Sequence, residues 1–94
     1  MAEPNQEIQI NLPPELQGGR YSNSMTVGHS KEEFVLDFMM VARPAGAVVA
    51  RVVVSPGHLK RIVRALQENL GRYEARYGEI REAGEPSPTD FRPN

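Results

Sequence analysis

Two adjacent apolar runs in the middle of the chain constrain its fold more than any other feature. FVLDFMMVAR spans Phe34 to Arg43 and AVVARVVV spans Ala47 to Val54, and both are apolar at consecutive positions. Successive side chains of a strand point to opposite faces, so a strand with one solvated face would be apolar only at every second position. We therefore expect two neighbouring strands that need a cover on both faces.

A long amphipathic helix follows these runs. Ser55 is a favourable N-cap residue and Pro56 a favourable first helical residue, and Gly78 is a natural end. Between them apolar residues recur every three or four positions, and the same spacing reaches Ile80: Leu59, Ile62, Val63, Leu66, Leu70, Tyr73, Tyr77 and Ile80. One apolar stripe covers one face of a sheet. The pattern predicts that the helix packs on one face and that a second subunit covers the other, where the candidate interface residues are Val35, Met39 and Val41.

Weaker strand signals precede the apolar runs. Apolar and polar residues alternate over residues 8–12 and again over residues 21–27, and Pro44 to Gly46 forms a turn signal between the two apolar runs. The predicted fold class is α+β, with a four-stranded antiparallel sheet followed by one long C-terminal amphipathic helix packed on one sheet face. We expect a single domain over residues 7–80, a flexible N-terminus over residues 1–6 and a disordered tail over residues 81–94.

Composition limits the class of protein. A chain of 94 residues makes one domain whose small core is marginal for an isolated monomer, so we expect a homodimer or a higher oligomer. The 11 basic and 12 acidic side chains leave a net charge of −1, which neither requires nor excludes nucleic acid. The chain has no cysteine and no apolar stretch near the roughly 18 residues of a membrane span. These features predict a soluble cytoplasmic protein without a membrane partner.

Charge is unevenly distributed along the chain. No acidic residue lies between Asp37 and Glu68, and four of the five cations of this segment, together with one histidine, suggest an anion-binding or partner-binding site: Arg43, His58, Lys60, Arg61 and Arg64. Cations in the first turns of a helix oppose its dipole, and a bound anion would reverse that effect. Three interpretations stay open here: a solvated basic face, a contact with nucleic acid, and a contact with an acidic protein partner.

Asp37 and Arg51 are the only charges inside the two apolar strands, and a short turn would place them opposite or diagonal to each other on one face. An ion pair at the sheet surface is one interpretation, and an Arg51 that meets a ligand anion is the other.

Catalytic patterns are missing from the sequence. His29 and His58 are the only imidazoles and do not have a metal-binding spacing, no serine has an evident base, and Gly18-Gly19 is too short for a phosphate loop. We therefore expect no enzyme, no metal and no cofactor. The predicted function is that of a non-catalytic homo-oligomeric interaction protein, either an adaptor or a holding chaperone. The alternative is a nucleic-acid-binding protein that uses the basic patch at the start of the helix.

Several short motifs are specific enough to compare with known families: Tyr21-Ser22-Asn23, Glu33-Phe34 with Leu36-Asp37-Phe38, Ser55-Pro56 with Lys60, and Asn69-Leu70 with Tyr73-Glu74 and Gly78. Together they resemble a small prokaryotic family known as domain of unknown function 3467. The resemblance covers about residues 7 to 80 and implies a stand-alone domain, but it implies no activity and no site. In topology, a sheet used for self-association and followed by a long helix is also similar to the SecB-type export chaperones.

Overall fold

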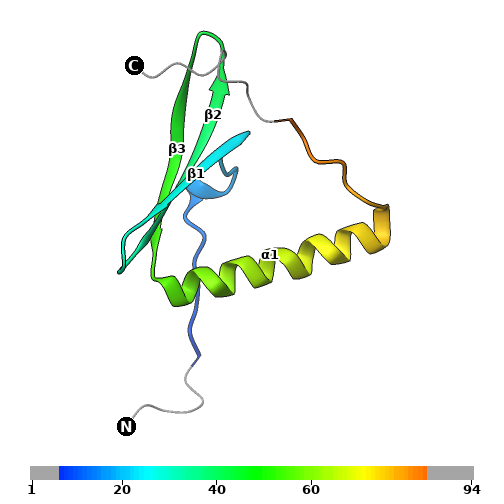
Figure 1. Ribbon diagram of the computed structural model, residues 1–94. Coiled ribbons are helices and arrows are strands. Elements are labelled where there is room, and N and C mark those ends of the chain that lie inside the picture. Colours follow the sequence, from blue (N-terminus) through cyan, green and yellow to red (C-terminus); the bar gives the residue numbers. More distant parts are fainter. Residues whose placement is uncertain (1–6, 85–94) are drawn as a thin grey trace.

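The computed structural model describes residues 7–84 and contains a three-stranded antiparallel sheet followed by one helix (Figure 1). In chain order the elements are a short 3-10 helix η1 (Pro14–Leu16), strands β1 (Ser24–His29), β2 (Phe34–Ala42) and β3 (Ala45–Val54), and helix α1 (Pro56–Tyr77). The strand order is β1-β2-β3, so β2 lies in the centre. The predicted α+β class, the two apolar strands and the helix are confirmed.

The register of the β2–β3 hairpin decides which side chains share a face. Leu36 pairs with Val52 and Asp37 with Arg51, and the register shifts by one residue after Phe38 so that Val49 has no partner in β2. The turn between the strands consists of Arg43 and Pro44. The predicted turn ran from Pro44 to Gly46 and is one residue longer, because Ala45 and Gly46 already belong to β3.

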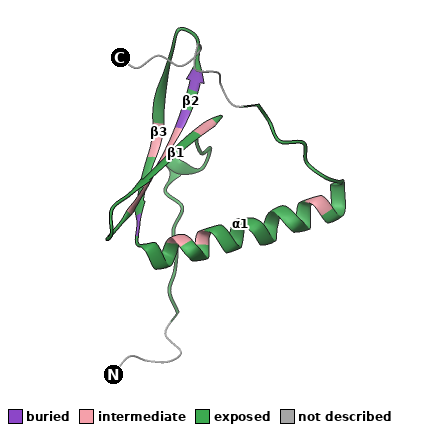
Figure 2. Cartoon of the chain, viewed as in Figure 1, coloured by how far each residue is buried: buried purple, intermediate pink, exposed green. Residues whose placement is uncertain are grey.

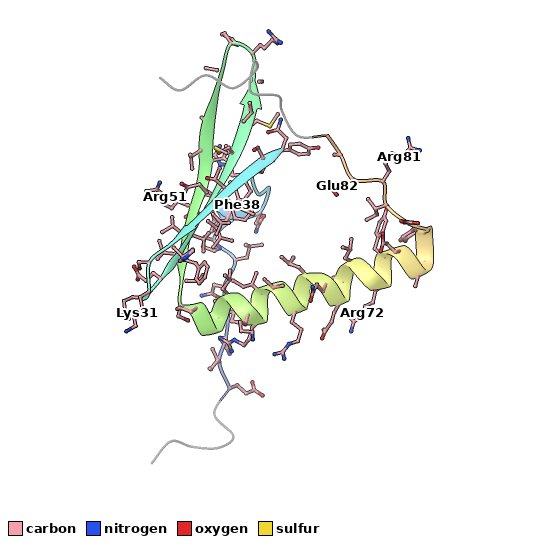
Figure 3. All side chains as sticks on the ribbon, in the orientation of Figure 1. Lys31, Phe38, Arg51, Arg72, Arg81 and Glu82 are labelled. Carbon is pink, nitrogen blue, oxygen red and sulfur yellow. The ribbon has the colours of Figure 1, made fainter. Side chains whose placement is uncertain are left out.

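The two faces of the sheet are named here by what lies on them. The η1 face carries Phe34, Leu36 and Phe38 of β2 with Val52 and Val54 of β3, whereas the Arg51 face carries Val35, Asp37, Met39 and Val41 of β2 with Arg51 and Val53 of β3. Arg51 projects from the side of the sheet that faces away from α1 (Figure 3).

Burial in the described chain is confined to the sheet. Four apolar side chains form the core, Leu36 and Val54 on the η1 face and Met39 and Val41 on the Arg51 face. Figure 2 shows the buried positions on β2 and β3, while α1 is exposed apart from a few half-buried positions. The sheet therefore has some cover on both faces, as its two-sided apolar pattern requires, but a complete cover on neither.

The prediction that α1 packs across a sheet face is wrong. Among residues 7–84, only the neighbouring strands have extensive contacts with each other, and α1 extends away from the end of β3 (Figure 1). Ser55 is the single residue between Val54 and the first helical residue, Pro56. Because Ser55 is extended and proline fixes its own φ, the direction in which α1 leaves follows the end of β3.

The predicted first strand is also wrong. Residues 7–13 form no regular structure, and Ile8 and Ile10 are 87% and 91% exposed. An alternating pattern becomes a strand only where it finds a strand to pair with, and Pro13 and Pro14 end this segment before it reaches the sheet. The sheet consequently has three strands rather than four.

The segment just before β1 continues the sheet through side chains. The Asn23 amide donates to the Val41 carbonyl at 2.8 Å, and the Val41 N–H donates to Asn23 Oδ1 at 2.8 Å. The Asn23 N–H and the Ser22 hydroxyl both donate to the Met39 carbonyl, at 3.0 Å and 2.9 Å. These bonds, made by the residues that precede β1, pair with the backbone of β2 and keep the buried Met39 and Val41 in place.

The structure describes only part of the predicted terminal segments. Residues 78–84 form no regular structure after α1, and they turn back from its C-terminal end (Figure 1). The predicted flexible residues 1–6 and residues 85–94 of the predicted tail lie outside the described residues.

We expect Asn23→Ala to destabilise the protein by about 1 kcal/mol, because the N–H and C=O groups of Val41 lose their side-chain partners in a partly buried place. Urea unfolding followed by circular dichroism measures the change. The control is Asn69→Ala, which removes only a bond to the Ala65 carbonyl on the exposed helix surface. Equal midpoints for the two variants would contradict the role assigned to Asn23.

Candidate interaction surfaces

The start of α1 is built by local capping. The Ser55 hydroxyl accepts a hydrogen bond from the His58 N–H at 3.2 Å, and the Leu59 N–H donates to the Ser55 carbonyl at 2.9 Å. Pro56 needs no partner for a donor that it lacks. The first turn contains no acidic residue. The helix therefore begins with its positive dipole end beside cations alone.

The structure separates the predicted anion-binding residues into two places. His58, Lys60, Arg61 and Arg64 lie in the first turns of α1, whereas Arg43 lies in the turn at the opposite end of β3, roughly 30 Å away at about 3.3 Å per strand residue. The four helix residues are exposed and spread around the polar half of α1. Arg61 Nη2 lies 3.0 Å from His58 Nδ1, on the opposite flank of the helix from Lys60. They form a broad basic surface and do not converge on one point.

Asp37 and Arg51 form the predicted ion pair, which is confirmed. They are directly paired in the β2–β3 register, with Arg51 Nε 2.7 Å from Asp37 Oδ1 and Arg51 Nη2 2.8 Å from Asp37 Oδ2. The hydrogen bonds from Arg51 lower the pKa of the Asp37 carboxyl, and those bonds together with the carboxylate charge raise the pKa of Arg51. Asp37 thus neutralises the cation at the centre of the Arg51 face.

The apolar side of α1 is largely uncovered in the described chain. Its side chains, called the α1 stripe below, are Leu59, Ile62, Val63, Leu66, Leu70, Tyr73 and Tyr77. Leu59 and Ile62 are half-buried near the sheet, and the others are exposed, up to 65% for Leu66 and Tyr77. The Tyr73 and Tyr77 rings lie 4.9 Å apart at the far end. The stripe has the composition of a helix face that packs against a neighbour, but most of its residues are exposed here.

Two hollows border apolar residues. One of about 550 Å³ runs along the first half of α1, where Leu59, Lys60, Val63, Arg64 and Gln67 line it. The other, of about 320 Å³, lies between η1 and the η1 face, where Leu16, Phe38 and Val52 are among the lining residues. Both are open and mainly apolar, which suits a hydrophobic partner better than a small polar substrate.

The predicted interface residues on the Arg51 face are less exposed than most of the α1 stripe. Met39 and Val41 are already buried within one chain, at 8% and 7% exposure, and Val35 is half-buried. Val48 and Val53 are the more exposed apolar side chains of this face. A partner on the Arg51 face would therefore contact these two valines before it reached the buried pair.

The outer half of the α1 stripe is the surface that sequence reasoning missed, because it assigned Leu66, Leu70 and Tyr73 to the sheet. One signal could have found it. The single residue between β3 and α1 leaves no linker with which the helix could fold back.

The described residues contain neither a cluster of metal ligands nor a membrane-spanning helix. Among residues 7–84, no group of three or more His, Asp or Glu side chains is arranged to hold a metal ion. The same part of the chain has no helix with the length and apolar content needed to cross a bilayer.

Comparison with known proteins finds one family. A family model described as "Protein of unknown function (DUF3467)" matches residues 1–82. Neither the curated proteins nor the solved structures include a significant match. The matched range includes the sheet, α1 and the segment that follows it.

We expect the Asp37–Arg51 pair to make stability depend on acid. Because the folded-state pKa of Asp37 is lowered below its ordinary value of 3.8, its contribution is complete above that value and is lost as the pH falls through the folded-state pKa. Asp37→Asn should therefore flatten the fall of the urea midpoint below pH 4. Glu32→Gln, in the exposed β1–β2 turn, is the control and should retain the slope. An unchanged slope in Asp37→Asn would contradict the coupling.

Proposed function

We propose that this chain, which belongs to the DUF3467 family, is a non-catalytic, homo-oligomeric interaction protein. The observation that carries the proposal is the imbalance between buried and exposed apolar side chains. Only Leu36, Met39, Val41 and Val54 are buried in the described chain, while the α1 stripe and parts of both sheet faces are uncovered. A single chain of this size with so little burial is poorly stabilised, and contiguous apolar surface of this kind favours a protein partner.

Two roles fit such a protein. An adaptor would bind a second copy of itself through one apolar surface and a different protein through another. A holding chaperone would use an adaptable apolar face, for which the exposed Met25 and Met40 on the η1 side of the sheet are suitable because methionine is flexible and polarisable. Both roles use binding alone, and we propose that the protein carries them out in the cytoplasm.

The alternative function is nucleic-acid binding through the basic surface at the start of α1. It is favoured by Lys60, Arg61 and Arg64 in a part of the helix without acidic residues. Contacts of three or four cations with phosphates would make the logarithm of the affinity for duplex DNA fall with the logarithm of salt concentration at a slope of about −3. An apolar interface depends much less on salt.

We expect the purified protein to have at least twice the mass of one chain in size-exclusion chromatography with light scattering at low micromolar concentration. The reason is that association buries the apolar side chains that the single chain exposes. A well-folded monomer with no concentration dependence would contradict the proposal.

A pull-down from the native lysate, with and without nuclease, distinguishes the two functions. For an interaction protein, the captured protein partner should persist after nuclease treatment and in moderate salt. Loss of all captured material after nuclease treatment, together with a salt slope near −3 for binding to a DNA duplex, would favour the alternative.

A further inference from the structure

We propose, building on the oligomer proposed above, that the occupant of the α1 stripe is α1 of a second copy of this chain, and that the two helices pack antiparallel. The sheet of the same chain does not cover the stripe, because α1 extends away from the end of β3 and only Leu59 and Ile62 are half-buried near the sheet (Figure 1). A second copy offers the same uncovered stripe, which is the situation that a two-fold symmetric interface resolves.

The stripe has the spacing of a two-stranded coiled coil. Six of its residues alternate at intervals of four and three over almost three heptads: Leu59, Val63, Leu66, Leu70, Tyr73 and Tyr77. Val63, Leu70 and Tyr77 occupy one core position of the heptad, and the other three occupy the second. This regular alternation describes a narrow seam that fits another helix.

Side-chain size favours the antiparallel orientation. With the two-fold axis near Glu68, the layers of the seam pair Leu70 with the partner's Leu66, Tyr73 with the partner's Val63 and Tyr77 with the partner's Leu59. Each tyrosine then meets a smaller aliphatic side chain. A parallel pair in register would place the tyrosines against each other at one end and leave only aliphatic residues at the other, which is a less even packing.

Charge favours the same orientation. The residues on one flank of the seam are Lys60, Gln67 and Glu74, spaced by seven. In the antiparallel pair Lys60 faces the partner's Glu74, the partner's Lys60 faces Glu74, and the two Gln67 side chains meet near the axis. In a parallel pair these flanking residues face the other flank, which consists of Ile62, Asn69 and Arg76, so the Lys60–Glu74 attraction is absent.

The geometry of Glu74 suits this role. Its Oε2 accepts a hydrogen bond from the Ile80 N–H at 2.9 Å, which holds the side chain beside the last turn of α1. That bond engages one carboxylate oxygen, and Oε1 can accept from a lysine. On the partner's side of the contact, Lys60 borders the hollow that Leu59, Val63 and Gln67 also line.

The antiparallel pair also gives the basic surface a purpose within the assembly. Lys60, Arg61 and Arg64 lie at the positive end of their own helix dipole, where cations are disfavoured. The pair brings the partner's negative C-terminal end alongside them. It also places the partner's Tyr77 next to Leu59, close to the end of the η1 face where Val54 is buried.

Charge exchange tests the orientation. At low ionic strength, Lys60→Glu should weaken dimerisation about tenfold, because two attractive contacts become repulsive. The double variant K60E/E74K should dimerise more tightly than either K60E or E74K alone. Residues 60 and 74 are about 21 Å apart along one helix, so such a rescue requires contact between copies. Glu74→Gln, which keeps an acceptor for the Ile80 N–H, controls for loss of the local bond.

Distances between spin labels test the arrangement independently, and the chain has no native cysteine to interfere. Labels at Ala65→Cys and Ala75→Cys should be offset along the helix pair by about 9 Å and about 21 Å, at 1.5 Å per residue on either side of the axis. A parallel pair would give no offset at either position. Leu66→Asp should abolish the dimer at micromolar concentration, whereas Ala65→Asp, on the polar side of α1, should retain it.

The outcomes separate this interface from the proposed function itself. A monomeric wild-type protein would overturn both. A wild-type dimer that K60E does not weaken, with label distances that do not follow a two-fold axis near Glu68, would overturn the helix pair and leave the oligomer in place. That second result is the one expected if the stripe instead packs on the partner's sheet or on a different protein.

Discussion

The single residue that joins β3 to α1 is the constraint on which the rest of the structure depends. Ser55 caps the helix and Pro56 fixes its first turn, so the chain passes from strand to helix without a flexible link. In this arrangement α1 extends away from the sheet and does not cover it. The apolar side chains that would form one core in a compact domain are therefore divided between two surfaces, and burial within one chain stops at four residues.

This division is the physical basis of the proposed assembly. Its sheet is held together by close polar pairing, including the bidentate Asp37–Arg51 contact and the Asn23 amide against Val41. These bonds specify register, but they supply little of the apolar burial that stabilises a domain. In the proposed antiparallel pair, the missing burial comes from a second copy, and the basic start of α1 meets the end of a helix that attracts it.

Much of the architecture could be predicted because it is set locally. The Ser55-Pro56 start, the Gly78 end and the heptad-like spacing between them define α1 without reference to any other element. The same holds for β2 and β3, whose continuous apolar runs predicted two adjacent strands, and for Asp37 and Arg51, whose opposite charges inside those runs indicated an ion pair as one of two interpretations. The α1 residues of the basic surface were likewise recognisable from the absence of acidic residues between Asp37 and Glu68, although Arg43 proved to lie at the other end of the hairpin.

The amino-acid sequence by itself determined the type of β2, β3 and α1, the limits of α1 and the sign of the charge along each of them, because periodicity, capping and turn residues act over a few positions. Only the tertiary structure decided what those elements bury. Residues 8–12 alternate like a strand but find no neighbouring strand, and the α1 stripe has the spacing of a buried helix face but lies largely away from the sheet of its own chain. Whether an apolar pattern becomes a core or a binding surface depends on the direction of one link and the register of one hairpin, and both are properties of the folded chain as a whole.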